Sequence, residues 1–188
     1  MKHKPNLLFI FSDQQRFDTM ACYGNRTIQT PYLNTLAQES FVFERAYVSQ
    51  PVCVAARTTI MTGMYPHTLS MGAKKAQLPP TARTLAEMVS QEYCCCYNGK
   101  WDLGDEVITQ YGFDQWVSTE DLYRSSYSRK EYLAQLSSYH HYLTKNGFEP
   151  DVEREGCKVF NRGTVAQLPA RHTKAMFQGR QAASFIKE

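Results

Sequence analysis

The chain has 188 residues, enough for a domain with a hydrophobic core, and 43% hydrophobic with 21% charged residues is an ordinary globular composition. The net charge is +3, and no run of lysine or arginine is longer than a pair. The chain therefore lacks the strongly basic character that is typical of proteins that bind nucleic acids or anionic membranes. The longest apolar run near the start, residues 7–11, is too short for a signal-peptide core or a bilayer span. The chain as written is therefore expected to be cytoplasmic; it would be periplasmic or secreted if a leader is missing.

The six cysteines do not indicate a disulfide framework or a zinc site. They include no CxxC pair, and the neighbours Cys94, Cys95 and Cys96 are poorly placed to pair with one another. Free thiols are typical of a reducing compartment. Except for Cys53, the cysteines are expected to be small buried hydrophobic residues.

Apolar runs and helical spacings alternate along the first half of the chain. Residues 6–11 form a short continuous apolar run, typical of a strand buried on both faces. Further strands are expected at 41–43, 46–48 and 93–97, and helices at 31–39, 57–64 and 84–89. Thr30 would cap the first helix, with Pro31 in its first turn. This alternation predicts an α/β layered fold with a mixed, mainly parallel sheet flanked by helices.

The second half is more polar. Residues 119–146 are rich in Tyr and Ser, with helical spacing from 132 to 143 and Gly147 as a natural stop. Residues 148–168 are expected to be irregular, and 172–186 to form another helix. In an alternating fold a further strand should follow such a helix. Residues 1–188 are therefore expected to be the N-terminal part of a larger domain.

Polar residues follow the first expected strand, at the sheet edge where open α/β proteins bind ligands. Asp13 and Gln14 offer a carboxylate and an amide oxygen, which suit a hard cation such as Ca²⁺ or Mg²⁺. The alternative for Asp13 is a helix N-cap.

Two further clusters follow later strands. Cys53 precedes an expected helix, with Arg57 one turn later, so an anionic nucleophile or an anionic substrate would lie in positive potential there. Lys100 follows the strand at 93–97 and could hold a negatively charged group. The local alternatives are a structural cysteine and a solvated loop lysine. All three clusters are expected at one edge of the same sheet, and this convergence favours a functional site.

Together these segments resemble the sulfatase family of the alkaline-phosphatase-like superfamily. The similarity lies in residues 5–13, 30–37, 51–57, 62–67 and 99–104, in the family's order and spacing. The pentapeptide Cys53-Val54-Ala55-Ala56-Arg57 matches the family's C/S-x-P/A-x-R motif. The resemblance implies that a maturation enzyme converts Cys53 to formylglycine.

The resemblance also implies a mechanism for cleaving sulfate esters. One oxygen of the hydrated formylglycine attacks sulfur, and the second hydroxyl then expels sulfate as the aldehyde re-forms. Asp13, Gln14 and the modified Cys53 would bind Ca²⁺ or Mg²⁺, Arg57 would orient the diol, and Lys100 would contact the sulfate. The substrate would be a sulfate-ester small molecule or a sulfated glycan.

The chain departs from the family pattern in two ways. Asp102 stands where the family usually has a histidine, and the family's remaining cation ligands belong to later strands and loops. Ca²⁺ normally takes 6–8 oxygen ligands, so these 188 residues by themselves are expected to show no turnover. The alternatives are a phosphonate or phosphate monoester hydrolase of the same superfamily, and a non-catalytic degenerate fragment.

Overall fold

The structure, a computed structural model, describes residues 4–71, 77–121, 124–150, 153–154, 157–158 and 168–188. The chain forms two compact units, Met1–Val48 and Ser49–Glu188. Cys53 and Lys100 belong to the second unit, and Asp13 belongs to the first.

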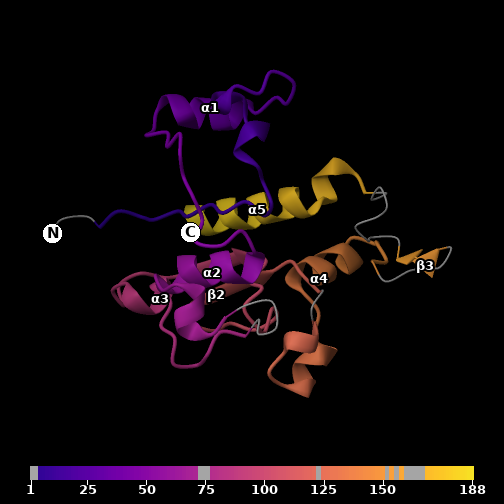
Figure 1. The fold of residues 1–188 in the computed structure, drawn as a ribbon. Coiled ribbons are helices and arrows are strands. Elements are labelled where there is room, and N and C mark those ends of the chain that lie inside the picture. Colours follow the sequence, from indigo (N-terminus) through magenta and orange to yellow (C-terminus); the bar gives the residue numbers. More distant parts are fainter. Residues whose placement is uncertain (1–3, 72–76, 122–123, 151–152, 155–156, 159–167) are drawn as a thin grey trace. The chain divides into compact units, whose positions relative to one another are not determined.

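The first unit contains helix α1 (Pro31–Gln38), preceded by two 3₁₀ turns at Phe17–Thr19 and Ala21–Tyr23 (Figure 1). The helix begins after Thr30 with Pro31 in its first turn, as predicted. The Thr30 hydroxyl accepts a hydrogen bond from the Ala21 backbone N–H at 3.0 Å. Thr30 therefore joins the second 3₁₀ turn to the start of α1 instead of capping the helix with its side chain.

The strands expected at 6–11, 41–43 and 46–48 are not formed. Leu7, Leu8, Phe9 and Ile10, expected in a strand buried on both faces, are 63–77% exposed. A strand requires a neighbour that pairs with its N–H and C=O groups. An apolar run favours burial, but it does not supply that neighbour, so these predictions were wrong.

The second unit contains four helices and two pairs of strands among its described residues. The helices are α2 (Cys53–Thr62), α3 (Leu85–Met88), α4 (Ser138–Lys145) and α5 (Lys174–Lys187). The strands are β1 (Cys96–Gly99), β2 (Gln115–Ser118), β3 (Glu153–Arg154) and β4 (Cys157–Lys158). Short 3₁₀ turns lie at Pro66–Leu69, Arg124–Ser126, Lys130–Ala134 and Ala170–His172.

Strands β1 and β2 pair in parallel, and β3 pairs with β4 in antiparallel fashion. The parallel pair with its helices confirms the predicted α/β class. The β3–β4 pair lies in the segment predicted to be irregular, so that prediction was wrong there.

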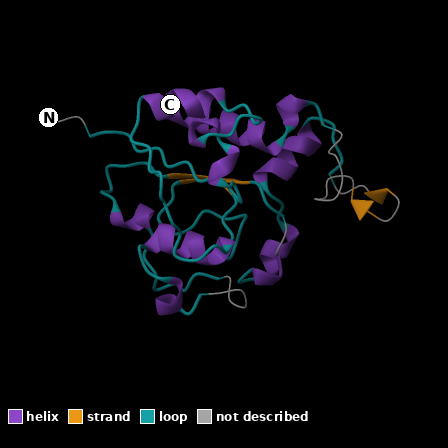
Figure 2. Ribbon diagram, turned by 45° about the horizontal axis from the view of Figure 1, so that its top comes forward, coloured by secondary structure: helices purple, strands orange, loops and turns teal. Residues whose placement is uncertain are grey.

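The β1–β2 pair, which Figure 2 shows nearly edge-on, makes different side-chain contacts on its two faces. Tyr97 of β1 lies opposite Trp116 of β2, and their rings stack at 4.7 Å between centroids. Asn98, the next residue, donates from its side chain to the Gln178 carbonyl oxygen of α5 at 2.8 Å. Successive side chains of a strand point to opposite faces, so the sheet has an aromatic face and a face that contacts α5.

The hydrophobic core lies on the aromatic face. Its buried members come from α2, from the segment between α2 and α3, and from the loop that follows β1: Met61, Met71, Leu78, Ala82, Trp101 and Leu103. Tyr97 and Trp116 pack against them. The core therefore anchors α2 to the loop that follows β1.

Helix α4 begins later than the spacing from residue 132 predicted. The Ser137 hydroxyl accepts a hydrogen bond from the His140 backbone N–H at 3.1 Å, which caps the helix. The Ser137 N–H and hydroxyl each donate to Asp121, at 2.6 Å. These bonds separate α4 from the 3₁₀ turn at Lys130–Ala134, which takes up the first part of the predicted helix.

The predicted burial of the cysteines was wrong for those whose surroundings are described. Cys22 and Cys94 are exposed, and Cys95 and Cys96 are half-buried. These four and Cys53 are free thiols, as expected. The surroundings of Cys157 lie outside the described part of the structure.

Within the described residues, no helix has both the length and the apolar character needed to cross a bilayer.

Candidate active site

Cys53 is the first residue of α2, and its side chain is half-buried. The preceding residue, Val52, is extended, so the helix starts abruptly at the cysteine. The first N–H groups of a helix have no partner within the helix, and the aligned peptide dipoles place partial positive charge there. The start of α2 therefore favours an anionic group at position 53 and an anionic substrate beside it.

Arg57 lies one turn after Cys53 and is only 6% exposed. Its guanidinium donates to the Lys100 carbonyl oxygen at 2.5 Å and to the Tyr97 hydroxyl at 3.3 Å. The Tyr97 hydroxyl also donates to the Lys100 carbonyl oxygen. Two donors thus meet at one carbonyl, and they hold the start of α2 against the loop that follows β1.

Tyr97 also contributes to this junction between α2 and the loop after β1, although no sequence motif pointed to it. Burial raises the pKa of Tyr97 above its ordinary value of 10, because the phenolate would lose its hydration. The phenol therefore stays protonated at neutral pH and keeps its hydrogen for the Lys100 carbonyl. Its place within a predicted strand did not distinguish it from a core aromatic residue.

Lys100 and Asp102 form an ion pair. The Lys100 ammonium nitrogen lies 3.3 Å from a carboxylate oxygen of Asp102, and the two side chains are 11% and 9% exposed. Lys100 is therefore not a solvated loop lysine, and that alternative was wrong. The position expected to hold an anion already carries a carboxylate supplied by the same loop.

Glu106 shapes this loop and was also missed. It is 2% exposed, and its carboxylate accepts the backbone N–H groups of Trp101, at 2.9 Å, and of Asp102. Burial raises the pKa of Glu106 to about 7, although these hydrogen bonds act in the opposite direction. Nothing in its sequence neighbourhood distinguishes Glu106 from a surface carboxylate, because the signal is the tertiary fold of the loop.

Gly99 leads from β1 into this loop with φ +137°, a conformation that residues with a side chain rarely adopt. An added Cβ would also lie 3.1 Å from the side-chain nitrogen of Gln178. Gly99→Ala is therefore expected to lower the free energy of unfolding by about 1–3 kcal/mol.

Urea denaturation would measure this loss, with Gly179→Ala as the matched control. Gly179 lies within α5 and has open space where a Cβ would be added. Replacing a helical glycine with alanine is expected to stabilise the protein by about 0.4–1 kcal/mol. Equal effects of the two substitutions would contradict a special role for the backbone at Gly99.

Asp13 and Gln14 lie in the first unit and are exposed. Asp13 is not a helix N-cap, because the 3₁₀ turn that follows begins at Phe17 with Arg16 as its cap. Gln14 has φ +56°, in the left-handed region.

The carboxylate and amide of these two residues are the right kind of donor for Ca²⁺ or Mg²⁺. Two side chains are too few ligands for such a cation, however. Within the described part of the chain, no group of three or more His, Cys, Asp or Glu residues could hold a metal ion. The described residues thus match a divalent cation in donor type and do not form a full coordination sphere.

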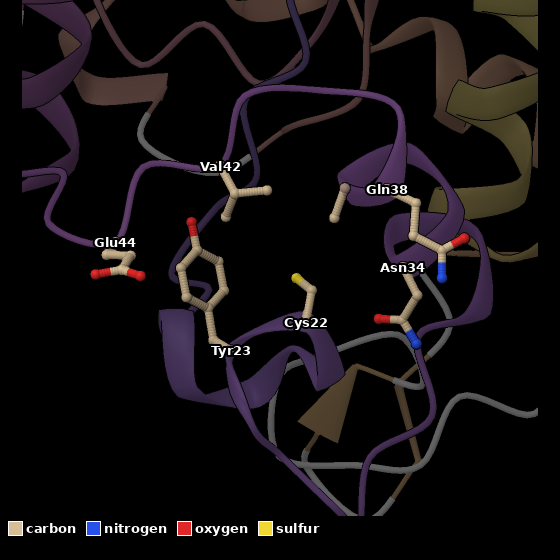
Figure 3. Close-up of a pocket in the computed structure, with 7 residues that line it drawn as sticks. Cys22, Tyr23, Asn34, Gln38, Val42 and Glu44 are labelled. Atoms are coloured by element: carbon tan, nitrogen blue, oxygen red, sulfur yellow. The ribbon is translucent and has the colours of Figure 1, made fainter.

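A hollow of about 670 Å³ lies within the first unit (Figure 3). Its lining consists of Cys22, Tyr23, Asn34, Ala37, Gln38, Val42 and Glu44. The Tyr23 hydroxyl donates to the Phe43 carbonyl oxygen at 2.7 Å and fixes part of this lining. None of the predicted site residues lines the hollow.

Known proteins share the sequence features of this chain. The sulfatase family model matches residues 5–175. An ulvan-active sulfatase of Formosa agariphila is 34% identical over 125 residues, which are 62% of this chain and 24% of that protein. An arylsulfatase of Clostridium perfringens is 46% identical over 61 residues, 32% of this chain and 13% of that protein. The chain thus spans about a quarter or less of the length of these relatives.

A solved structure supports the fold. The phosphonate monoester hydrolase of Agrobacterium radiobacter aligns with 98% of this chain and 38% of its own, with a TM-score of 0.67 and 19% identity. At this identity the likeness concerns the architecture alone. Because the family model matches most of the residues, including the pentapeptide and the loop after β1, this chain belongs to the sulfatase family.

Proposed function

We propose that the protein is a sulfuric ester hydrolase that uses formylglycine derived from Cys53. The observation that carries this proposal is the buried Arg57 of the pentapeptide, which bonds to the backbone of Lys100. That bond joins the helix start bearing the nucleophile position to the loop bearing the cationic group. An anionic ester would meet the positive end of the helix dipole at the start of α2 and the Lys100 ammonium of this loop.

The three residues have different roles in this proposal. Hydrated formylglycine at position 53 would supply a geminal diol, one oxygen attacking sulfur and the other releasing sulfate. Arg57 orients this position from one turn away and adds positive charge beside it. Lys100 contacts the sulfate group of the substrate through its ammonium group.

A divalent cation, Ca²⁺ or Mg²⁺, is part of the proposal as a Lewis acid and template. Asp13, Gln14 and the modified residue 53 are proposed as ligands. The oxygen donors of Asp13 and Gln14 support this assignment, since such cations prefer carboxylate and amide oxygens. Further ligands are required to complete the coordination.

The proposed substrate is a sulfate ester, either a small molecule or a sulfated glycan. The names of two relatives, an ulvan-active sulfatase and an arylsulfatase, support this range. A formylglycine-generating enzyme is the proposed maturation partner. Ala55 is fully buried and Arg57 nearly so, hence such an enzyme could read the pentapeptide only before the chain folds.

Mass spectrometry of the protein made in its native host tests the proposal. Peptides containing residue 53 should show the loss of thiol mass expected for formylglycine. Exposed Cys22 and Cys94 provide controls in the same digest and should keep their thiols. An unmodified cysteine at position 53 in every peptide would contradict the proposal.

Turnover distinguishes sulfate esters from the related phosphonate substrates. Full-length protein should cleave an aryl sulfate in preference to an aryl phosphonate, and Cys53→Ala should abolish both activities. A strong preference for the phosphonate would instead identify the protein as a phosphonate monoester hydrolase.

A further inference from the structure

The carboxylate of Asp102 is built into the loop that carries Lys100. Its oxygen lies 3.3 Å from the Lys100 ammonium, and each side chain is about one-tenth exposed. Asp102 has φ +61°, and its backbone N–H donates to the buried carboxylate of Glu106. Backbone and side chain are thus both held in place, in contrast to a mobile ion pair at a surface.

A fixed negative charge beside Lys100 acts on any anion that binds there. An anion in contact with the ammonium must also lie within a few ångströms of the Asp102 carboxylate. The repulsion between them is proportional to the charge of the anion. Arg57 reaches the same loop through the Lys100 carbonyl oxygen, and Glu106 adds a carboxylate behind the Trp101 and Asp102 backbone.

We propose that Asp102 is a specificity-determining residue, which makes the Lys100 site select singly charged esters over doubly charged ones. Sulfate esters and phosphonate monoesters carry one negative charge, whereas phosphate monoesters carry nearly two at neutral pH and above. This inference rests on the proposed function, because it takes Lys100 as the group that contacts the ester anion.

The proportionality gives a quantitative expectation. Removal of the Asp102 charge should strengthen the binding of a singly charged anion by some factor. The affinity for a doubly charged anion in the same position should then rise by the square of that factor. With solvent screening, the gain is about 5-fold for one charge and about 25-fold for two. A general loosening of the loop would change both affinities alike.

The test compares methyl sulfate with methyl phosphate, two anions of the same shape that differ by about one charge at pH 8. Binding to the 188-residue chain would be measured by NMR titration at constant ionic strength, for the unsubstituted protein and for Asp102→Asn. Asparagine preserves the side-chain shape and tolerates the left-handed backbone better than most residues. Asp102→Gly is a second variant, because glycine accepts φ +61° without strain.

Both variants are expected to gain far more affinity for methyl phosphate than for methyl sulfate. Equal gains, no gain, or no binding of either anion to Asp102→Asn and Asp102→Gly would overturn the inference. These readings do not depend on turnover or on residue 53. An unmodified Cys53 with intact charge selection would reject the proposed function alone, and formylglycine at position 53 without charge selection would reject this inference alone.

Discussion

Replacing Trp101 with alanine is expected to lower the free energy of unfolding by about 3–5 kcal/mol. Trp101 is fully buried, and its ring packs edge-on against Tyr97 at 5.1 Å and Trp116 at 5.2 Å between centroids. Its removal would leave a cavity between the aromatic face of the sheet and the loop that carries Lys100. Urea denaturation followed by fluorescence or circular dichroism would measure the loss.

Two further variants make this prediction specific. Trp101→Phe keeps an aromatic ring and removes a buried indole N–H that has no acceptor within the described residues, so its loss should be smaller. Tyr65→Ala removes an aromatic ring that is 63% exposed, and its effect should stay within about 0.5 kcal/mol. A small effect of Trp101→Ala would contradict a core role for the tryptophan.

Glu106 is expected to make the stability of the protein fall as the pH rises from about 4.5 to about 7. Burial raises the pKa of Glu106 from its ordinary value of 4.5 to about 7. The folded state therefore binds the proton more tightly than the unfolded state does in this window. Stability from this group is fully present below pH 4.5, decreases through the window and levels off above pH 7. The total decrease is about 3 kcal/mol.

Urea denaturation at a series of pH values would measure this decrease in the free energy of unfolding. Glu106→Gln cannot ionise, and the variant should lose this decrease. Glu131→Gln is the control, because Glu131 is exposed in an ion pair with Arg129 and its substitution should leave the decrease in place. A Glu106→Gln variant with the unchanged pH dependence would show that another group is responsible.

The helices were predicted best, because their signals are local. Pro31 in the first turn predicted α1. At the start of α3, the Thr84 backbone N–H donates to the Glu87 carboxylate at 2.9 Å, so this helix start too depends on residues that are close in sequence. The helix predicted from residue 57 begins four residues earlier, at Cys53. That shift places the cysteine in the first turn of α2, within the positive end of the helix dipole.

Strands were predicted less well, since a strand depends on a partner elsewhere in the chain. The strand predicted at 93–97 exists as β1 at Cys96–Gly99, where it pairs with β2. The apolar run at 6–11 has the composition of a strand and forms none. Composition determines the tendency to be buried, whereas pairing is decided by the rest of the fold.

The sequence by itself determined which residue types are present at the candidate site, their order, and the family to which they point. The tertiary structure alone decided how they are arranged. The bond from Arg57 to the Lys100 carbonyl spans 43 positions of sequence, too far for any local pattern to predict. The pairing of Lys100 with Asp102 and the burial of Glu106 likewise depend on a loop folded against the aromatic core. Charge and hydrogen-bonding capacity are properties of single residues, but their partners are brought within reach only by packing.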